Sequence, residues 1–163
     1  MRNLTTILCL TLVILLGSAG NSKSADFQKG LTAYNSGDYA TALREWKPLA
    51  KQGNAVAQYN LGVMYDNGQG VSQDDKTAVK WYKLAAKQGD ARAQYNLGLM
   101  YALGNGVIQD NVYAHMWWNI AASSGEKNAV KNRDIVAGKM TPAQIAEAQK
   151  LARECVRKKY KGC

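Results

Sequence analysis

Very few side chains of this 163-residue sequence could do covalent or metal chemistry. It contains a single histidine, His115, and catalysis or metal binding by histidine needs partners that converge on one point. His115 stands beside Trp117 and Trp118 in a helical pattern, which favours a half-buried packing role or a surface role. The sequence has no Gly-x-Ser-x-Gly motif and no phosphate-loop motif. We therefore predict that the chain is not an enzyme and has no catalytic residue.

Three aspartates offer the oxygen ligands that a metal ion would need. Asp74 and Asp110 each stand directly before a predicted helix, where an aspartate accepts hydrogen bonds from the amides of the first turn. Asp75 follows Asp74 in the chain. Because helix capping explains two of the three aspartates, we predict no metal site.

Two pairs of glycines resemble part of a dinucleotide-binding fingerprint. They lie at Gly68 and Gly70 and again at Gly104 and Gly106. The third glycine of that fingerprint and the strand before it are both missing. We therefore predict no cofactor, and we interpret these glycines as loop residues suited to positive φ.

The elements that carry these residues form an internal repeat. The stretch 57–89 returns as 93–125, at an offset of 36 residues and without a gap. A fixed period of roughly 20–50 residues is typical of a stacked-repeat solenoid. The apolar residues of each copy recur at helical spacing, so the predicted fold class is all-α. Gly62 and Gly98 fall in the middle of predicted helices, which indicates a close contact between helices there.

Each repeat is predicted to be a pair of helices. The first helices, which we name A, cover about 54–66 and 90–103. The second helices, which we name B, begin after the aspartates described above and end at Gly89 and Gly125.

Helices are also predicted on both sides of the two repeats. A shorter pair should occupy 26–36 and 39–52, where Pro48 predicts a kink or a frayed end. A degenerate A helix at 128–139 and a capping helix at 141–160 should close the stack. The predicted organisation is a signal peptide at 1–24, an atypical helix pair at 25–53, repeats at 54–89 and 90–125, and a degenerate repeat with the capping helix at 126–163.

The first residues have the three parts of a signal peptide. These are Arg2, an apolar run over 4–16, and small residues at 17–19. The run is shorter than the about 20 residues that span a bilayer. Cleavage is predicted after Ala19 or later, at 24–25, and an uncleaved anchor is the alternative. No cysteine follows the run at the spacing of a lipoprotein anchor, so we predict a soluble periplasmic or secreted protein.

Export would change the role of the cysteines. Cys9 would leave with the signal peptide, whereas Cys155 and Cys163 would remain. An even number of cysteines in an oxidising compartment predicts a disulfide, which would stabilise the fold by roughly 2–3 kcal/mol. Free or intermolecular thiols are the alternative.

The chain is basic, with a net charge of +9 and a pI near 9.5. This charge suits an acidic partner, an anionic membrane surface or nucleic acid, but export without a recognition motif argues against nucleic acid. The cations of the last helix are either a solvated face near its negative dipole end or a weak contact with an anionic envelope surface. They are Lys150, Arg153, Arg157, Lys158, Lys159 and Lys161.

The motif shared by the two copies, AxYNLGxMYxxGxGVxxDxxxAxxWYxxAAxxG, closely resembles the Sel-one-like repeat (SLR) family, which is related to the tetratricopeptide repeat. The segment MTPAQIAEAQKLARE at 140–154 is similar to the C-terminal segment of short exported bacterial members. The resemblance implies a right-handed α-solenoid of antiparallel helix pairs with a C-terminal capping helix. It also implies a monomeric, non-enzymatic scaffold that binds an unidentified protein or peptide.

A cysteine-rich branch of this family implies the alternative function. Its members carry Cys-x7-Cys pairs, and β-lactam hydrolysis has been ascribed to some of them. Cys155 and Cys163 have this spacing once, outside the full repeats. The alternative is therefore an envelope hydrolase that acts on a β-lactam or on cell-wall material.

Tetratricopeptide relatives bind their partners on the concave face that the A helices form. Matching Leu61, Gly62 and Tyr65 to their Leu-Gly-Tyr signature implies a partner-binding groove. For Tyr59 and Tyr95, packing between neighbouring A helices is the alternative. We expect specificity to lie where the two copies differ on this face. The groove residues are Val56, Tyr59, Val63, Asp66, Asn67, Arg92, Tyr95, Leu99, Ala102 and Leu103.

Overall fold

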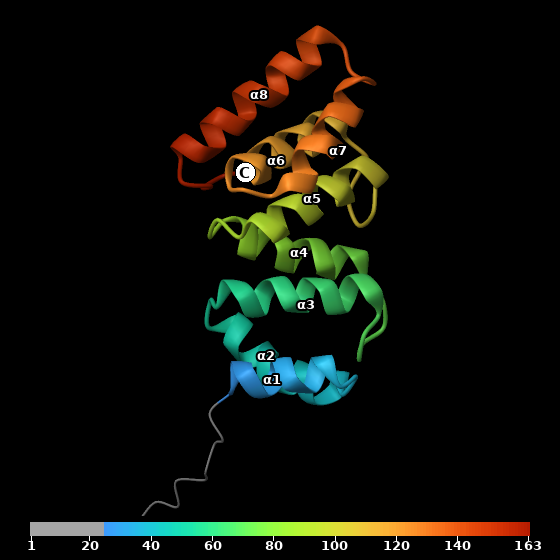
Figure 1. The fold of residues 1–163 in the computed structure, drawn as a ribbon, viewed down its shortest axis with the longest axis vertical. Helices are drawn as coiled ribbons and strands as arrows, with labels where there is room; N and C mark the ends of the chain where they lie inside the picture. Colours follow the sequence, from blue (N-terminus) through green and yellow to red (C-terminus); the bar gives the residue numbers. More distant parts are fainter. Residues whose placement is uncertain (1–24) are drawn as a thin grey trace, which may run out of the picture.

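The protein is a curved stack of α-helices (Figure 1). The computed structural model describes residues 25–163, so the predicted signal peptide and its cleavage positions lie outside the described residues. No helix within 25–163 is both long and apolar enough to cross a membrane. The helices of this part are α1 (Phe27–Asn35), α2 (Tyr39–Lys51), α3 (Ala55–Asn67), α4 (Asp75–Ala86), α5 (Ala91–Leu103), α6 (Asn111–Ser123), α7 (Lys127–Ala137) and α8 (Pro142–Arg157).

Polar caps begin the helices of the repeats, as the sequence predicts. The Asn54 side chain accepts a hydrogen bond from the amide three residues on at 2.9 Å, and Asp74 does the same at 3.0 Å. Thr141 and Gln144 form the predicted capping box before α8. The four caps within the repeats are Asn54, Asp74, Asp90 and Asp110.

Glycines end the A helices and allow the chain to turn toward the B helices. Gly68 ends α3 with φ 67°, and Gly104 ends α5 with φ 77°. These left-handed conformations are open to glycine at no steric cost, so the predicted role of the loop glycines is confirmed.

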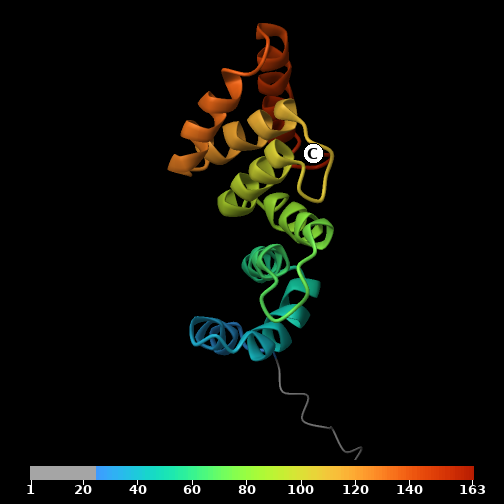
Figure 2. The ribbon, with the colours of Figure 1, turned by 90° about the vertical axis from the view of Figure 1, so that its right-hand side faces the viewer.

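From α1 to α7 each helix packs on the next one along the chain, α5 also contacts α7, and α8 packs on α6. The helices therefore follow one another along the long axis of the molecule, from α1 at one end to α7 and α8 at the other (Figure 2). This arrangement confirms the predicted all-α solenoid of helix pairs.

A glycine in each A helix lies against an aromatic ring of the B helix that follows it. A Cβ atom added at Gly62 would lie 2.5 Å from ring carbons of Tyr82, and one at Gly98 would clash in the same way with Trp118. The pair before the repeats has the same contact between Gly30 and Trp46. The predicted close approach at Gly62 and Gly98 is therefore confirmed, and the ring of the partner helix is its cause.

The aromatic side chains of these contacts are also held by their polar atoms. The indole N–H of Trp46 donates to the backbone oxygen of Phe27 at 3.2 Å. Trp118 donates to the backbone oxygen of Tyr95 at 3.1 Å. These bonds tie α2 to α1 and α6 to α5, because each acceptor lies on the first helix of the pair.

The stack ends at α7 because the surface of α7 lacks the glycine on which the aromatic ring of another B helix would pack. Asp134 stands one period after Gly98, and its side chain is 61% exposed and paired with Arg133 at 2.8 Å. A charged side chain at the glycine position leaves no room for an aromatic ring. The last helix, α8, accordingly packs on α6 instead of α7.

The proline in α2 does not fray the helix. α2 continues past Pro48 to Lys51, and the amide of Gln52 donates to the backbone oxygen of Pro48 at 3.0 Å. Pro48 lies in the last turn, so few intrahelical bonds follow it that could be lost. Of the two predicted outcomes, a kink or a frayed end, the frayed end is therefore wrong.

Candidate functional site

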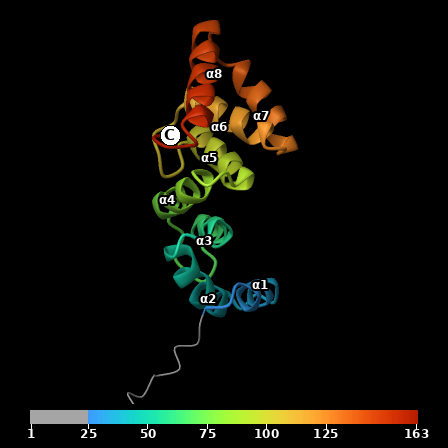
Figure 3. The ribbon, with the colours of Figure 1, turned by 90° about the vertical axis from the view of Figure 1, so that its left-hand side faces the viewer.

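The candidate site is the face of the A helices. Figure 3 shows α1, α3 and α7 on the same side of the stack, with α1 and α7 projecting beyond α3. This side of the stack thus curves inward. All ten residues predicted to form the groove belong to α3 or α5.

Tyr59 and Tyr95 connect neighbouring A helices. The guanidinium of Arg92 in α5 lies over the Tyr59 ring, 4.3 Å from its centre. The hydroxyl of Tyr95 accepts a hydrogen bond from the side chain of Asn132 in α7 at 3.1 Å. Both tyrosines are half-buried. For these two residues, packing between A helices was the alternative to partner binding. The structure shows that part of each side chain is used in such packing.

Asp66 connects an A helix with its B helix. Its carboxylate accepts a hydrogen bond from the Tyr82 hydroxyl at 3.0 Å. Burial raises the pKa of the Asp66 carboxyl, although the bond from Tyr82 opposes this shift. Burial raises the pKa of the Tyr82 hydroxyl too, so Tyr82 keeps its proton and is the donor. The polar group of Asp66 is thus engaged inside its own repeat.

Three further groove residues are half-buried by packing. Val63 packs against the core around α4 and α5, and Leu99 and Ala102 pack against the core around α6 and α7. Their side chains fill space between helices and leave only part of their surface to a partner.

Four of the ten residues remain exposed, and they form two equivalent pairs. Val56 and Arg92 occupy the same position in successive repeats, near the start of the A helix. Asn67 and Leu103 occupy the last position of the A helix, and Leu103 is 66% exposed. The two repeats thus present different chemistry at the same two places.

The histidine is not placed for catalysis. His115 is only 3% exposed, so the predicted half-buried or surface position is wrong. It stands one period after Val79, another buried side chain of a B helix, and its Nδ1 has no hydrogen-bond partner. Burial and the positive charge of Arg133 lower the pKa of His115, which keeps the imidazole neutral at neutral pH.

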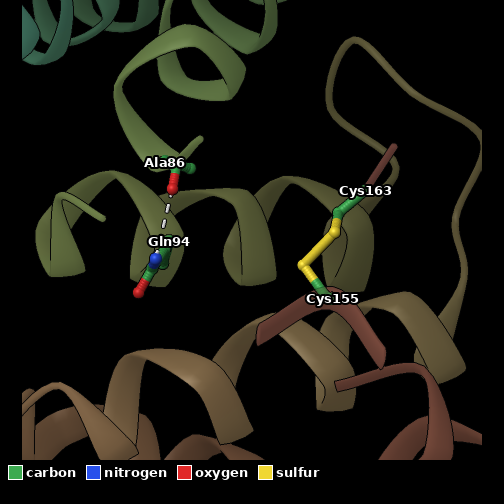
Figure 4. The surroundings of a disulfide bond; sticks show 4 residues. All are labelled: Ala86, Gln94, Cys155 and Cys163. Atoms are coloured by element: carbon green, nitrogen blue, oxygen red, sulfur yellow. Dashed lines mark hydrogen bonds between the residues drawn. A yellow bond between two sulfur atoms is a disulfide. The ribbon is translucent and has the colours of Figure 1, made fainter. Parts of the chain in front are cut away.

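The cysteines lie at the end of α8, where Cys155 and Cys163 form a disulfide (Figure 4). The bond folds the last residues back, and Tyr160 comes close to Gly89 in the turn between α4 and α5. Cys155 is buried in the same core as Met116. The disulfide therefore holds the C-terminal segment against the second repeat.

A pair of buried glutamines, which were not predicted from the sequence, joins successive helix pairs. Gln58 donates to the backbone oxygen of Ala50 at 3.0 Å, and Gln94 donates to that of Ala86 at 3.2 Å (Figure 4). A polar residue that recurs in both copies within an apolar stripe was the available signal. Each glutamine satisfies a carbonyl at the end of the preceding B helix, where the helix leaves carbonyls unpaired.

This geometry defines a class of protein, a short α-solenoid built from helix pairs with a 36-residue period. The Sel1 repeat family model matches residues 55–90 and 91–126. The chain thus carries two Sel1 repeats, as its motif indicates.

The solved structures that are similar to the chain include two repeat proteins from bacteria. One is c5321, a protective antigen of uropathogenic Escherichia coli strains that displays an SLR fold, with a TM-score of 0.75 and 29% identity over 80% of this chain. The other is a Sel1 repeat protein from Oxalobacter formigenes, with a TM-score of 0.67 and 29% identity over 79% of this chain. The chain spans 30% and 55% of the lengths of these proteins, respectively. No curated protein matches the chain significantly.

Proposed function

We propose that this protein is an exported, non-enzymatic interaction module that holds a protein or peptide on the face of its A helices. The Sel1 repeat is in general a scaffold for protein–protein interaction, which is the part of the proposal that the family supports. The export and the position of the binding face are the parts that need testing.

The observation that carries the proposal is the contrast between identical and differing residues of the repeats. The identical ones, such as Gly62, Gly98 and the glutamines, are used in packing. The differing and exposed ones gather at the two ends of the A helices. A surface that varies on a constant backbone is what recognition of a specific partner requires, because a few side chains determine most of the binding energy.

Three observations support export. The first is the signal-peptide pattern of residues 1–24. The second is the disulfide, since such bonds persist in oxidising compartments. The third is the similarity to c5321, a protective antigen present in uropathogenic Escherichia coli strains.

The experiment compares two variants with the same chemical changes on opposite faces. The groove variant carries Arg92→Glu and Leu103→Asp, and the control carries Leu84→Asp on α4 and Lys87→Glu at the C-cap of α4. All four side chains are exposed, but Arg92 also lies over the Tyr59 ring and pairs with Asp90 at 2.7 Å, so the groove variant should melt a few degrees below the control while remaining folded. The melting temperature of each variant is measured before capture, because Arg92 contacts the Tyr59 ring and its substitution also removes a contact between A helices.

Partners are captured from an envelope extract and measured by quantitative mass spectrometry. We expect a defined set of proteins with the wild type and the control, and loss of that set with the groove variant. Equal capture by all three proteins would show that the A-helix face is not the binding surface. Capture that is reduced equally by both variants would show that net charge alone attracts the partners.

A further inference from the structure

A second recessed surface lies between α6 and α8, outside the A-helix face. It is a cleft of about 420 Å³, and none of the ten predicted groove residues lines it. Its floor is apolar and deep, since Ile120 is 1% exposed and Ala152 is 3% exposed, while Val156 stands at the rim and is 46% exposed. The residues that line it are Asn119, Ile120, Ser123, Ala152, Arg153, Val156 and Arg157.

The cleft is cationic. Arg153 and Arg157 line it, and no carboxylate does. Among residues 25–163, neither arginine has a salt-bridge partner. The nearest acid in the sequence, Glu154, lines a separate small cavity beside Cys163. Asn119, within the cleft, accepts a hydrogen bond from Arg133 of α7 at 3.3 Å, which brings a third guanidinium close. Two unpaired guanidinium groups beside an apolar floor are unusual for a surface that meets only water.

The size of the cleft limits what it can hold. Its walls are residues 119–123 of α6 and 152–157 of α8, so it extends over one to two helical turns, or roughly 6–9 Å. This length suits one or two large side chains. It is too short to hold the apolar face of a whole helix, which needs anchors over about two turns.

We propose that this cleft binds an acidic segment of a partner protein, in which a large apolar side chain enters the cleft and flanking carboxylates pair with Arg153 and Arg157. Guanidinium groups pair with carboxylates through two parallel hydrogen bonds, so the arginines provide orientation as well as charge. The site is separate from the A-helix face, and so it goes beyond the function proposed above. The recessed floor favours a peptide over a membrane, because membrane docking needs apolar side chains that protrude.

The test starts from a phage-displayed library of random dodecapeptides selected on the wild-type protein. Enriched peptides are synthesised with a fluorescent label, and their binding is measured by fluorescence anisotropy. We expect sequences in which Asp or Glu flanks Leu, Ile or Phe, with affinity that falls as salt is added.

Two variants locate the site. Arg153→Glu with Arg157→Glu reverses the charge of the cleft, and Ser123→Trp fills it from its exposed rim without any change of charge. Each should weaken binding about tenfold or more, since charged pairs and a buried anchor both contribute at that level. The control, Lys47→Glu with Lys51→Glu on α2, has the same charge change at exposed positions and should bind as the wild type does.

Three outcomes would overturn the proposal. The library could enrich no acidic–apolar class, or the enriched peptides could bind the cleft variants as tightly as the wild type. In the third outcome, the library yields no acidic–apolar peptide, while vesicles of phosphatidylglycerol and phosphatidylcholine bind the wild type but not the cleft variants. This result would identify the cleft as a lipid-binding site. The Arg92→Glu/Leu103→Asp variant changes the A-helix face and should bind the cleft peptides as the wild type does. The proposal for the A-helix face and the proposal for the cleft can therefore fail separately.

Discussion

The contact between Gly62 in α3 and the Tyr82 ring in α4 gives a strong test of how the helix pairs are held. Helix propensity alone predicts that Gly62→Ala stabilises the protein by about 1 kcal/mol, because alanine restricts the unfolded chain more than glycine does. The new Cβ would lie 2.5 Å from ring carbons of Tyr82. That distance is far below the ~3.5–4.0 Å of a favourable carbon contact.

The ring has no easy way to move. Tyr82 is 0% exposed, its hydroxyl is bonded to Asp66 at 3.0 Å, and its ring centre lies 6.0 Å from that of Tyr59. Inserting a methyl group into such packing costs about 1–3 kcal/mol. Displacing the hydroxyl from Asp66 adds about 1 kcal/mol. After the gain in propensity is subtracted, we expect Gly62→Ala to lower the free energy of unfolding by about 1–3 kcal/mol.

The assay is urea unfolding followed by circular dichroism, with Gly138→Ala as the matched control. Gly138 has φ −62°, and a Cβ there would meet its nearest atom, the backbone oxygen of Ile135, at 3.5 Å. This is an ordinary contact in a conformation that alanine adopts without strain. The control should therefore be as stable as the wild type, or more stable by up to about 1 kcal/mol.

A second background separates the clash from other effects of the methyl group. In Tyr82→Leu the ring is gone, so the added cost of Gly62→Ala should largely disappear, with a coupling energy of about 1 kcal/mol or more. The reasoning is refuted if Gly62→Ala stabilises the protein as Gly138→Ala does. It is refuted equally if the same loss persists in the Tyr82→Leu background.

Three further predictions concern groups inside the stack. The folded-state pKa of His115 is lowered from 6.5, so the unfolded chain takes up this proton first as the pH falls. The free energy of unfolding of the wild type should therefore fall as the pH is lowered from about 7.5 to about 5.5. That of His115→Val should fall less over the same range, as measured by the midpoints of urea unfolding. Gln94 Oε1 is buried without a partner, because Ser124 stands where the first repeat has a glutamine that donates to Gln58. Ser124→Gln should raise the free energy of unfolding by about 0.5–1.5 kcal/mol, and an unchanged value would show that the donor does not reach. Cys155→Ser with Cys163→Ser should lower the free energy of unfolding by about 2–3 kcal/mol. A reductant should lower the free energy of unfolding of the wild type by the same amount and leave that of the variant unchanged.

Much of the fold can be predicted from local patterns. Asn54 and Asp74 are caps because their side chains reach amides only three residues away, and that relation is visible in the sequence. Gly68 and Gly104 turn the chain because a positive φ suits glycine wherever it occurs. The period of 36 residues predicts the stack, since identical units bury their apolar faces against one another.

The candidate site was less predictable. The alignment with related repeats selects one face of α3 and α5, but it does not separate packing residues from exposed ones. Tyr59 is partly covered by Arg92 from the next repeat, and Asp66 is engaged by Tyr82 from the next helix. Such contacts depend on how far neighbouring helices are apart, and that distance is not encoded in the residues of one helix.

Local patterns predict the repeat, the approximate helix bounds and the close approach at Gly62 and Gly98, because each of these depends on residues within one or two helices. The packing of α8 on α6 and not on α7, and with it the cleft that holds Arg153 and Arg157, becomes visible only when the helices are packed together. Two surfaces compete for α8. Asp134 blocks close packing on α7, while α6 still has apolar surface to bury, and the result depends on both helices together.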